Sequence, residues 1–395
     1  MTFYTSASFF AVLACLVVPA AACGVAGRGL KAWGMAASAV MVAFLFAGSP
    51  VQAAAFLLFL AVASAAAWAT LSSWRSGARS MAVYRISLLA TVAPLVIYKV
   101  GAVFDQNLLA FAGISYVTFK AVQVLIEIRD GLIEDLRPLD YLYFLTFFAT
   151  ITSGPIDRSR RFVADISRQP SRGEYLDLLT RGVMLLLVGA VSQLVVATIL
   201  RAAYDPVAAC EASSALGLVA RQVAAAYLFG LYLFFDFAGY SLMAMGASYC
   251  FGVRTPRNFR APFAAVDIKD FWNRWHITLS TWLRDFVFMR FVRWATKRKV
   301  FASRLSCACA AYVVDMALMG AWHGLTVDYL SYGLYHGALL AATEAYQKRS
   351  AFHKRHRKKV WYQLLSWFIT LQLVIIGFAL FSGQLHILVE RIING

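Results

Sequence analysis

The stretch GVMLLLVGAVSQLVVATIL, residues 182–200, decides the fold class. It holds no charged side chain, and its length matches the ~20 mostly apolar residues that a helix needs to cross a bilayer. Within lipid, a helix satisfies its backbone hydrogen bonds inside one segment. Similar stretches recur along the chain, and they predict ten membrane helices: 6–26, 32–48, 51–72, 81–103, 108–129, 174–202, 214–251, 305–324, 328–347 and 361–382.

The overall composition agrees with this pattern. Of the 395 residues, 61% are hydrophobic and 14% are charged, whereas soluble domains average about 25% charged residues. No soluble domain or internal repeat interrupts the apolar stretches. We therefore predict an all-α, polytopic, multi-pass protein of the cell membrane. We expect about 10–11 spans, with re-entrant and interfacial helices around a central tunnel, and residues 1–395 forming a single membrane domain.

The net charge of +17 comes from basic loops between the apolar segments. Such loops indicate the cytoplasmic side and anionic lipid headgroups, so we expect a lipid bilayer as partner and no nucleic acid. The segment 139–152 is apolar but short, and is either re-entrant or a further span. If it does not cross, both termini lie outside and four basic loops share the cytoplasmic side: 75–79, 158–172, 254–304 and 348–359.

Neither the N-terminus nor the cysteines indicate a different class of protein. No positive charge precedes the first apolar run, as a signal peptide requires, so we expect this run to be the first membrane helix. Five of the six cysteines fall in apolar segments and none forms a CxxC pair. We therefore expect small buried hydrophobic residues and predict no disulfide framework and no metal site.

Residues 269–293 show a different pattern from the spans. Their apolar residues recur at three- and four-residue steps, which predicts one amphipathic helix lying in the interface or lining a wet cavity. His276 falls at the border between its two faces. The apolar face contains Phe271, Trp275, Leu279, Trp282, Phe286 and Met289, and the polar face contains Lys269, Asp270, Asn273, Arg274, Thr281, Arg284 and Asp285.

A few polar side chains lie within apolar segments, where they are costly and often functional. His323 ends one segment in the sequence Trp322-His323-Gly324. Asp315 precedes it by eight residues, about 12 Å along a helix, so the two should line one cavity without touching. Asp236 lies in another segment. For both aspartates, pairing with a cation or capping a broken helix is the alternative role.

The segment that contains residues 120–129 carries several polar groups together. Lys120 and Glu127 are seven residues apart, on one helical face. We therefore expect an internal pairing between them.

Three passages together resemble the membrane-bound O-acyltransferase family. They are FDFAGYS at 235–241, continuing to Phe251-Gly252; DFWNRWHITLS at 270–280, continuing to WLRD at 282–285; and WHG at 322–324. Their order and spacing fit as well. The resemblance implies that His323 is catalytic, that His276 occupies the second conserved polar position, and that the catalytic core spans about 110–345.

Further passages resemble the family members that transfer D-alanine to envelope polymers. They are GISY at 113–116, EIRDG at 127–131, SGPIDR at 153–158, RRF at 160–162 and FVFMRF at 286–291. Alginate-type acetyltransferases of the family share the RWHITLS motif but usually continue with a proline-glycine-glycine stretch. Met289-Arg290 stands at that place here.

The D-alanine resemblance implies a donor, an acceptor and partners. The donor is D-alanine held as a thioester on the phosphopantetheine arm of a small acyl carrier protein, which acts on the cytoplasmic side. The acceptor is teichoic acid or a related envelope polymer, reached on the outer side with accessory membrane proteins. No cofactor is bound permanently.

The residues fit this chemistry. A thioester is already activated, so the site needs a base near neutral pKa, a role that suits histidine, and a donor for the developing oxyanion, which His276 or Asn273 could supply. An acidic carrier should dock on basic loops, at Arg254 and Arg257. The candidates for the substrate tunnel are Asn273, Trp272, Trp275, Trp282, Arg284, Asp285, Asp236 and Asp315.

Two other functions compete with D-alanyl transfer. One is the same chemistry with an acetyl donor and a different polysaccharide. The other, from a different class, is a transporter or flippase, which would also place charges inside the membrane. The sequence shows no inverted halves with matching helix breaks, which speaks against a transporter.

Overall fold

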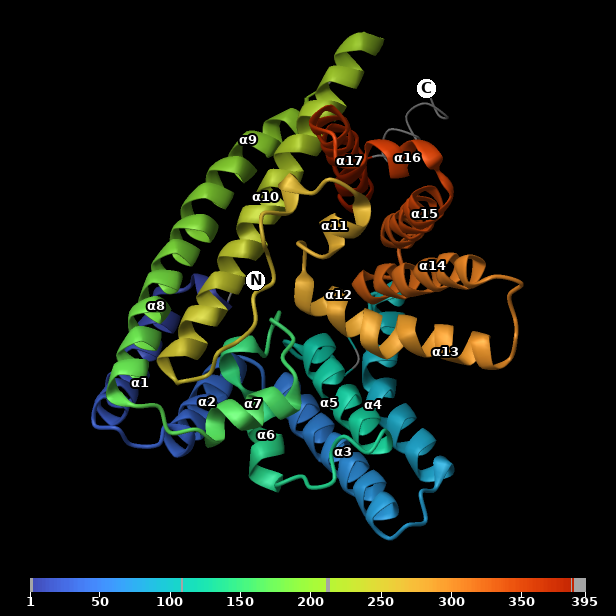
Figure 1. Ribbon diagram of the computed structural model, residues 1–395. Coiled ribbons are helices and arrows are strands. Elements are labelled where there is room, and N and C mark those ends of the chain that lie inside the picture. The colour runs from blue at the N-terminus through green and yellow to red at the C-terminus, as the bar shows by residue number, and fades with distance from the viewer. Residues whose placement is uncertain (1–2, 108, 211–213, 385, 387–395) are drawn as a thin grey trace. The chain divides into compact units, whose positions relative to one another are not determined.

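The computed structural model describes residues 3–384 and 386, except 108 and 211–213, and within them it contains helices and no strand (Figure 1). The all-α prediction is therefore confirmed. The chain forms two compact units, each built from separate stretches of sequence. The first comprises Met1–Ala190 with Gly239–Arg257, and the second comprises Val191–Ala238 with Asn258–Gly395.

Serine caps and proline mark the starts of helices in the first unit. The side chain of Ser49 accepts a hydrogen bond from the backbone N–H of Gln52, and Pro50 follows in the first turn, where its missing N–H is not needed. The first unit contains η1 (Phe3–Thr5), α1 (Ala7–Val25), α2 (Lys31–Phe46), α3 (Pro50–Arg75), α4 (Met81–Gly101), η2 (Ala102–Phe104), α5 (Ile114–Arg129), α6 (Pro138–Thr146), η3 (Phe148–Thr150), α7 (Ser159–Ser167), α8 (Arg172–Ala190) and the C-terminal part of α10 (Ala215–Cys250).

Helix α5 is the centre of the first unit. Fourteen of its sixteen residues are buried, and it packs against α3, α4, α6 and α7. The polar side chains of a helix buried on all sides must find hydrogen-bond partners within the protein. The buried polar residues Lys120, Gln123 and Glu127 all lie on this helix.

The second unit carries the motifs of the C-terminal half. It contains the first part of α10 and the following elements: η4 (Val191–Ala197), α9 (Thr198–Ala209), η5 (Pro262–Ala264), α11 (Ile268–Trp272), α12 (Ile277–Leu283), η6 (Arg284–Phe288), α13 (Met289–Lys297), α14 (Arg304–His323), α15 (Val327–Arg349), α16 (Ala351–His356) and α17 (Val360–Phe381).

Glycines let α14 and α15 approach closely. A Cβ added at Gly320 would lie 2.4 Å from the carbonyl oxygen of Tyr329, and one added at Gly333 would lie 2.4 Å from that of Met316. Small residues at such crossings bring two backbones together, which is how membrane helices gain packing energy. The crossing fixes the C-terminal end of α14, where His323 lies.

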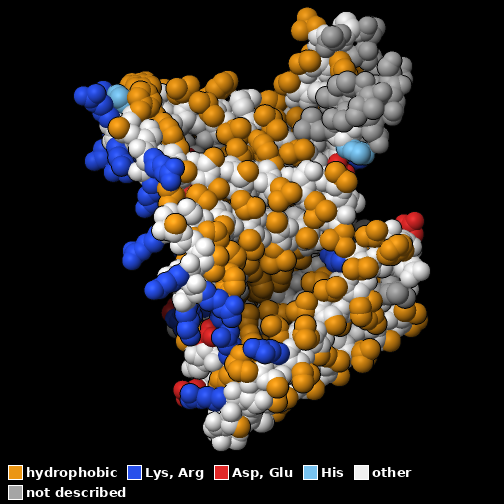
Figure 2. All heavy atoms as spheres, turned by 90° about the vertical axis from the view of Figure 1, so that its right-hand side faces the viewer, with side chains coloured by type: hydrophobic (Ala, Val, Ile, Leu, Met, Phe, Trp, Pro, Cys, Tyr) orange, Lys and Arg blue, Asp and Glu red, His pale blue; other side chains and the backbone are white. Residues whose placement is uncertain are grey.

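Seven helices in the described residues are long and apolar enough to span a membrane: Ala7–Val25, Pro50–Arg75, Met81–Phe104, Arg172–Ala209, Leu216–Cys250, Arg304–His323 and Val360–Phe381. All ten predicted spans fall on helices, but three are not among these seven. Helices α2 and α5 have only sixteen residues each, and α15 is long enough but not apolar enough. Figure 2 shows hydrophobic side chains over much of the face that it draws, as expected of helices that meet lipid. A polytopic membrane protein is confirmed.

The short apolar segment 139–152 forms α6 and η3. Helix α6 has nine residues and therefore rises about 14 Å, less than half of a hydrocarbon layer of about 30 Å. Tyr141, Phe144 and Phe148 are fully buried. By its length, α6 does not cross the bilayer on its own.

Candidate active site

The segment 269–293 is not one continuous helix, so that prediction is wrong. Helix α11 ends at Trp272, α12 begins at Ile277, and the chain turns to π-helix over 284–288. The backbone of another loop replaces the missing intrahelical bonds. The N–H of Arg260 donates to the carbonyl of Arg274 at 3.0 Å, and the N–H of Ile277 donates to the carbonyl of Asn258 at 2.9 Å.

His276 lies at this break and is buried, with 3% of its surface exposed. Its predicted place at the border of an interfacial helix is therefore wrong. The flanking residues Trp272 and Trp275 are buried as well. The periodic spacing correctly identified side chains that pack, but the break turns the histidine inward. Its backbone adopts φ +43°, a left-handed conformation that is uncommon for a residue other than glycine.

The imidazole of His276 has an apolar environment. It meets the ring of Phe237 edge-on, with centroids 4.7 Å apart. Neither ring nitrogen has a hydrogen-bond partner among the described residues. Burial, with a smaller contribution from the nearby His323, lowers the pKa of His276 to about 3. The ring is therefore neutral at physiological pH, with one N–H to donate and one nitrogen to accept.

His323 ends α14 and is half-buried in an aromatic cluster. Its ring centroid lies 5.9 Å from that of Tyr329 and 5.0 Å from that of Phe381. Trp322 joins the two histidines: its ring lies 4.6 Å from that of His323 and 6.4 Å from that of His276. The fold thus brings together two histidines that are 47 positions apart in the sequence.

A separate cavity of about 200 Å³ collects four of the predicted tunnel residues: Trp272, Asn273, Arg284 and Asp315. Its described lining includes neither histidine. One carboxylate oxygen of Asp315, Oδ1, is buried without a hydrogen-bond partner. A buried polar atom in that state indicates a ligand or a water.

The other tunnel candidates have structural partners. Trp275 is 5% exposed and stacks on Phe271, with centroids 5.6 Å apart. Trp282 packs against Phe286, and Asp285 pairs with Arg284 at 3.0 Å. Asp236 accepts a hydrogen bond from Nε2 of Gln193 at 2.9 Å. This partner is a neutral amide, whereas the alternative role would have paired Asp236 with a cation.

Comparison with known proteins identifies the family. The sequence model of the membrane-bound O-acyltransferase (MBOAT) family matches residues 34–382 of this chain. The chain belongs to this family. It is 37% identical over 399 residues to the teichoic acid D-alanyltransferase of Bacillus subtilis (strain 168), covering 97% of this chain and 98% of that protein. It is 38% identical to the enzyme of the same name from Streptococcus thermophilus, covering 79% of this chain and 78% of that protein.

A second group of relatives is less similar. A probable alginate O-acetylase of Pseudomonas syringae pv. tomato is 30% identical over 286 residues, which cover 70% of this chain and 49% of that protein. The predicted resemblance to membrane-bound O-acyltransferases is thus confirmed. The protein is an acyltransferase and a multi-pass protein of the cell membrane. Membership in this family favours the acyltransferase hypothesis over the transporter hypothesis.

A second fully buried histidine was missed by the sequence analysis. His336 on α15 is 1% exposed, and its Nδ1 accepts a hydrogen bond from the indole N–H of Trp272 at 3.3 Å. The available signal was a histidine inside the apolar segment 328–347. Because Trp272 lines the cavity, His336 orients one of its walls.

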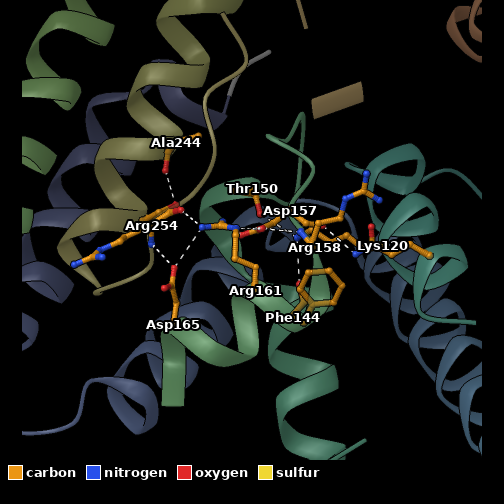
Figure 3. Close-up of polar contacts among 11 residues, drawn as sticks. Lys120, Phe144, Thr150, Asp157, Arg158, Arg161, Asp165, Ala244 and Arg254 are labelled. Atoms are coloured by element: carbon orange, nitrogen blue, oxygen red, sulfur yellow. Dashed lines mark hydrogen bonds and ion pairs between the residues drawn. The ribbon is translucent and has the colours of Figure 1, made fainter. Parts of the chain in front are cut away.

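The predicted pairing of Lys120 with Glu127 is wrong. Nζ of Lys120 donates to Thr150 Oγ1 at 2.9 Å and to the carbonyl of Phe144 at 3.1 Å (Figure 3). Glu127 instead accepts from the hydroxyl of Ser159 at 2.9 Å. Because α5 is buried on all sides, residues on one of its faces meet different neighbouring helices rather than each other.

Polar contacts from α7 hold the basic loop that contains Arg254. Arg161 binds Asp157 and also donates to the carbonyl of Arg254, whose N–H donates to Asp165 at 2.8 Å (Figure 3). The side chains of Arg254 and Arg257 are exposed. Their loop is thus anchored by its backbone while its guanidinium groups remain available.

Proposed function

We propose that this protein moves D-alanine from the phosphopantetheine thioester of an acyl carrier protein towards a hydroxyl of teichoic acid or a related envelope polymer. The observation that carries the proposal is the 37% identity to a teichoic acid D-alanyltransferase over 97% of the chain. The less similar alginate O-acetylases align with a smaller share of the chain.

His323 is the proposed general base. It takes the proton of the acceptor hydroxyl while that oxygen attacks the thioester carbonyl. The carbon–sulfur bond then breaks, an ester forms, and the carrier's sulfur leaves and is protonated. Because the thioester is already activated, the transfer itself requires neither a nucleotide nor a metal.

His276 is proposed to donate a hydrogen bond to the developing oxyanion. Its neutral ring has an N–H, and its two nitrogens lack partners among the described residues. A donor held in a dry apolar site needs no reorganisation as charge develops, so its effect is larger there than in water. The surrounding aromatic rings also keep water from the thioester.

The cavity at Asp315 is proposed to hold part of the pantetheine arm. At about 200 Å³ it is smaller than the ~300–1,000 Å³ of a typical ligand pocket, so it fits a segment of a chain rather than a whole ligand. Trp272 supplies an apolar wall, and Asn273, Arg284 and Asp315 supply groups that can bind amides. The carrier docks on the cytoplasmic side at Arg254 and Arg257, and the acceptor and accessory membrane proteins act on the outer side.

The test uses purified protein reconstituted in vesicles with a polymer acceptor. The carrier is loaded with D-alanine in one arm and with acetate in the other, and the polymer is analysed by mass spectrometry. We expect D-alanyl esters on the polymer with the wild-type protein, and their loss when His323 is replaced. Acetyl transfer without D-alanyl transfer would overturn the proposal in favour of a polysaccharide acetyltransferase. Transport that survives His323→Ala would favour a transporter instead.

A further inference from the structure

A second cavity, distinct from the one at Asp315, lies wholly within the second unit. It measures about 600 Å³ and lies among α15, α16, α17 and the loop before α11. Its lining has two kinds of side chain. The apolar side chains include Leu339, Leu365, Ile369 and Leu373. The polar side chains include Tyr346, Gln347, His353, Arg357, Tyr362, Gln363 and Ser366.

The polar side of this cavity belongs to a strongly cationic segment. Residues 348–359 contain seven Lys or Arg and two His, and the sequence has no Asp or Glu from 345 to 389. Arg357 is exposed and lines the cavity. His353 lines it as well, and its Nδ1 lies 2.9 Å from the hydroxyl of Tyr362, which leaves Nε2 as the ring nitrogen that a ligand could use. An anionic group matches this surface.

One carboxylate also lines the cavity, but it is already engaged. Asp267 Oδ1 accepts a hydrogen bond from the backbone N–H of Asp270 at 2.8 Å. Its Oδ2 accepts one from Nε2 of Gln347 at 2.9 Å. The neighbouring acid Glu344 pairs with Lys269 at 2.6 Å. The ion pair offsets the charge of Glu344, while Asp267 keeps its charge and is held by hydrogen bonds from neutral groups. The seven Lys and Arg side chains of 348–359 outnumber this one carboxylate, so they dominate the potential.

The apolar side of the cavity continues along a membrane span. Helix α17 is long and apolar enough to cross the bilayer, and Leu365 and Ile369, which line the cavity, are both about half exposed. Trp361, near the start of α17, is similarly exposed, and tryptophan is typical of the membrane interface. A ligand that fills the cavity must therefore be anionic at one end and apolar at the other.

We propose that this cavity binds an anionic phospholipid of the cytoplasmic leaflet. Arg357 and His353 bind its phosphate, and an acyl chain lies along Leu365 and Ile369. The positive-inside rule places the cationic segment 348–359 on the cytoplasmic side. An acidic protein would match the charges but not the apolar half of the cavity, which distinguishes a lipid from a docked carrier.

The test measures lipid retention by the purified full-length protein. Phosphatidylglycerol or phosphatidylcholine is titrated into micelles, and bound lipid is counted by native mass spectrometry. We expect Arg357→Gln to weaken phosphatidylglycerol binding about five-fold, the effect of one cation near an anionic headgroup. Lys358→Gln is the matched control, because Lys358 is equally cationic and exposed but does not line the cavity.

Two further variants and a soluble probe complete the test. Ala342→Phe fills the cavity and should weaken phosphatidylglycerol binding, with thermal unfolding in phosphatidylcholine unchanged. Soluble glycerol phosphate should compete only weakly, since it lacks an acyl chain. Equal losses in Arg357→Gln and Lys358→Gln would show unspecific attraction and overturn the proposal. So would loss of carrier binding, with lipid binding intact, in Arg357→Gln.

Discussion

At the scale of single residues, the two histidines near Trp322 differ in what surrounds them. His276 is enclosed, neutral, and without partners for its ring nitrogens among the described residues. His323 is half-buried at the end of a helix. An enclosed polar ring without partners is expensive, and a group bound during the proposed reaction would supply the missing hydrogen bond. A half-buried ring at a helix end can exchange protons more readily.

We therefore predict unequal effects of substituting the two histidines. His323→Ala removes the base and should lower turnover about 10³-fold or more, with the protein still folding and binding carrier. His276→Ala removes an oxyanion donor and should leave more residual activity, about 10²-fold below wild type. His276→Asn keeps an N–H donor and should lose still less. Turnover with one acyl-carrier donor measures each variant, and near-normal turnover of His323→Ala would refute this mechanism.

The depressed pKa of His276 leads to a second prediction. Burial lowers this pKa to about 3, so the ring stays neutral from pH 5 to pH 9. Any ionisation seen in that range belongs to another group. The pH–rate profiles of wild type and His276→Asn should therefore have the same shape and differ only in height. If the acidic limb disappeared in His276→Asn, His276 would be the titrating group and the assignment of roles would have to be reversed.

At the scale of elements, the approach of α8 to α10 in the first unit depends on glycine. A Cβ added at Gly246 would lie 2.5 Å from the carbonyl oxygen of Gly182, and one added at Gly189 would lie 2.7 Å from that of Gly239. These contacts involve backbone atoms, which cannot move aside as a flexible side chain can. The two helices are therefore held at a distance that only glycine permits.

A third prediction tests this crossing. Gly246→Ala should push α8 and α10 apart and lower the free energy of unfolding by roughly 1–3 kcal/mol, as overpacking does. Thermal unfolding in detergent measures the effect. Gly173→Ala is the control, because nothing lies within 4 Å of a Cβ added at Gly173. Equal melting temperatures for Gly246→Ala and Gly173→Ala would show that the crossing tolerates a methyl group.

At the scale of the whole molecule, the sequence predicted what depends on composition and missed what depends on tertiary contacts. The spans followed from apolar length, whereas the catalytic roles of His276 and His323 stay predictions that rest on motifs. The break before His276 was not predictable, because its replacement hydrogen bonds come from the loop at Asn258–Arg260. The partners of Lys120 were missed for the same reason, since they belong to α6 and η3. The single-domain prediction stays a prediction.

The net charge of the molecule bears on its encounter with a carrier. An excess of cations steers an acidic partner and raises its association rate, most strongly at low salt. The exposed guanidinium groups of Arg254 and Arg257 stand on a loop whose backbone is held by Arg161 and Asp165. A fixed backbone reduces the entropy that the loop would lose on binding. These two residues should therefore contribute to docking more than cations on unanchored loops.

The fourth prediction follows from this anchored charge. Arg254→Glu or Arg257→Glu should slow carrier association several-fold and flatten its dependence on salt, with dissociation less affected. Arg79→Glu, a reversal on another predicted cytoplasmic loop, carries the same change in net charge and serves as control. Association rates across a salt series separate the cases. If all three variants slowed equally, the overall charge alone would steer the carrier, and if none did, the carrier would dock elsewhere.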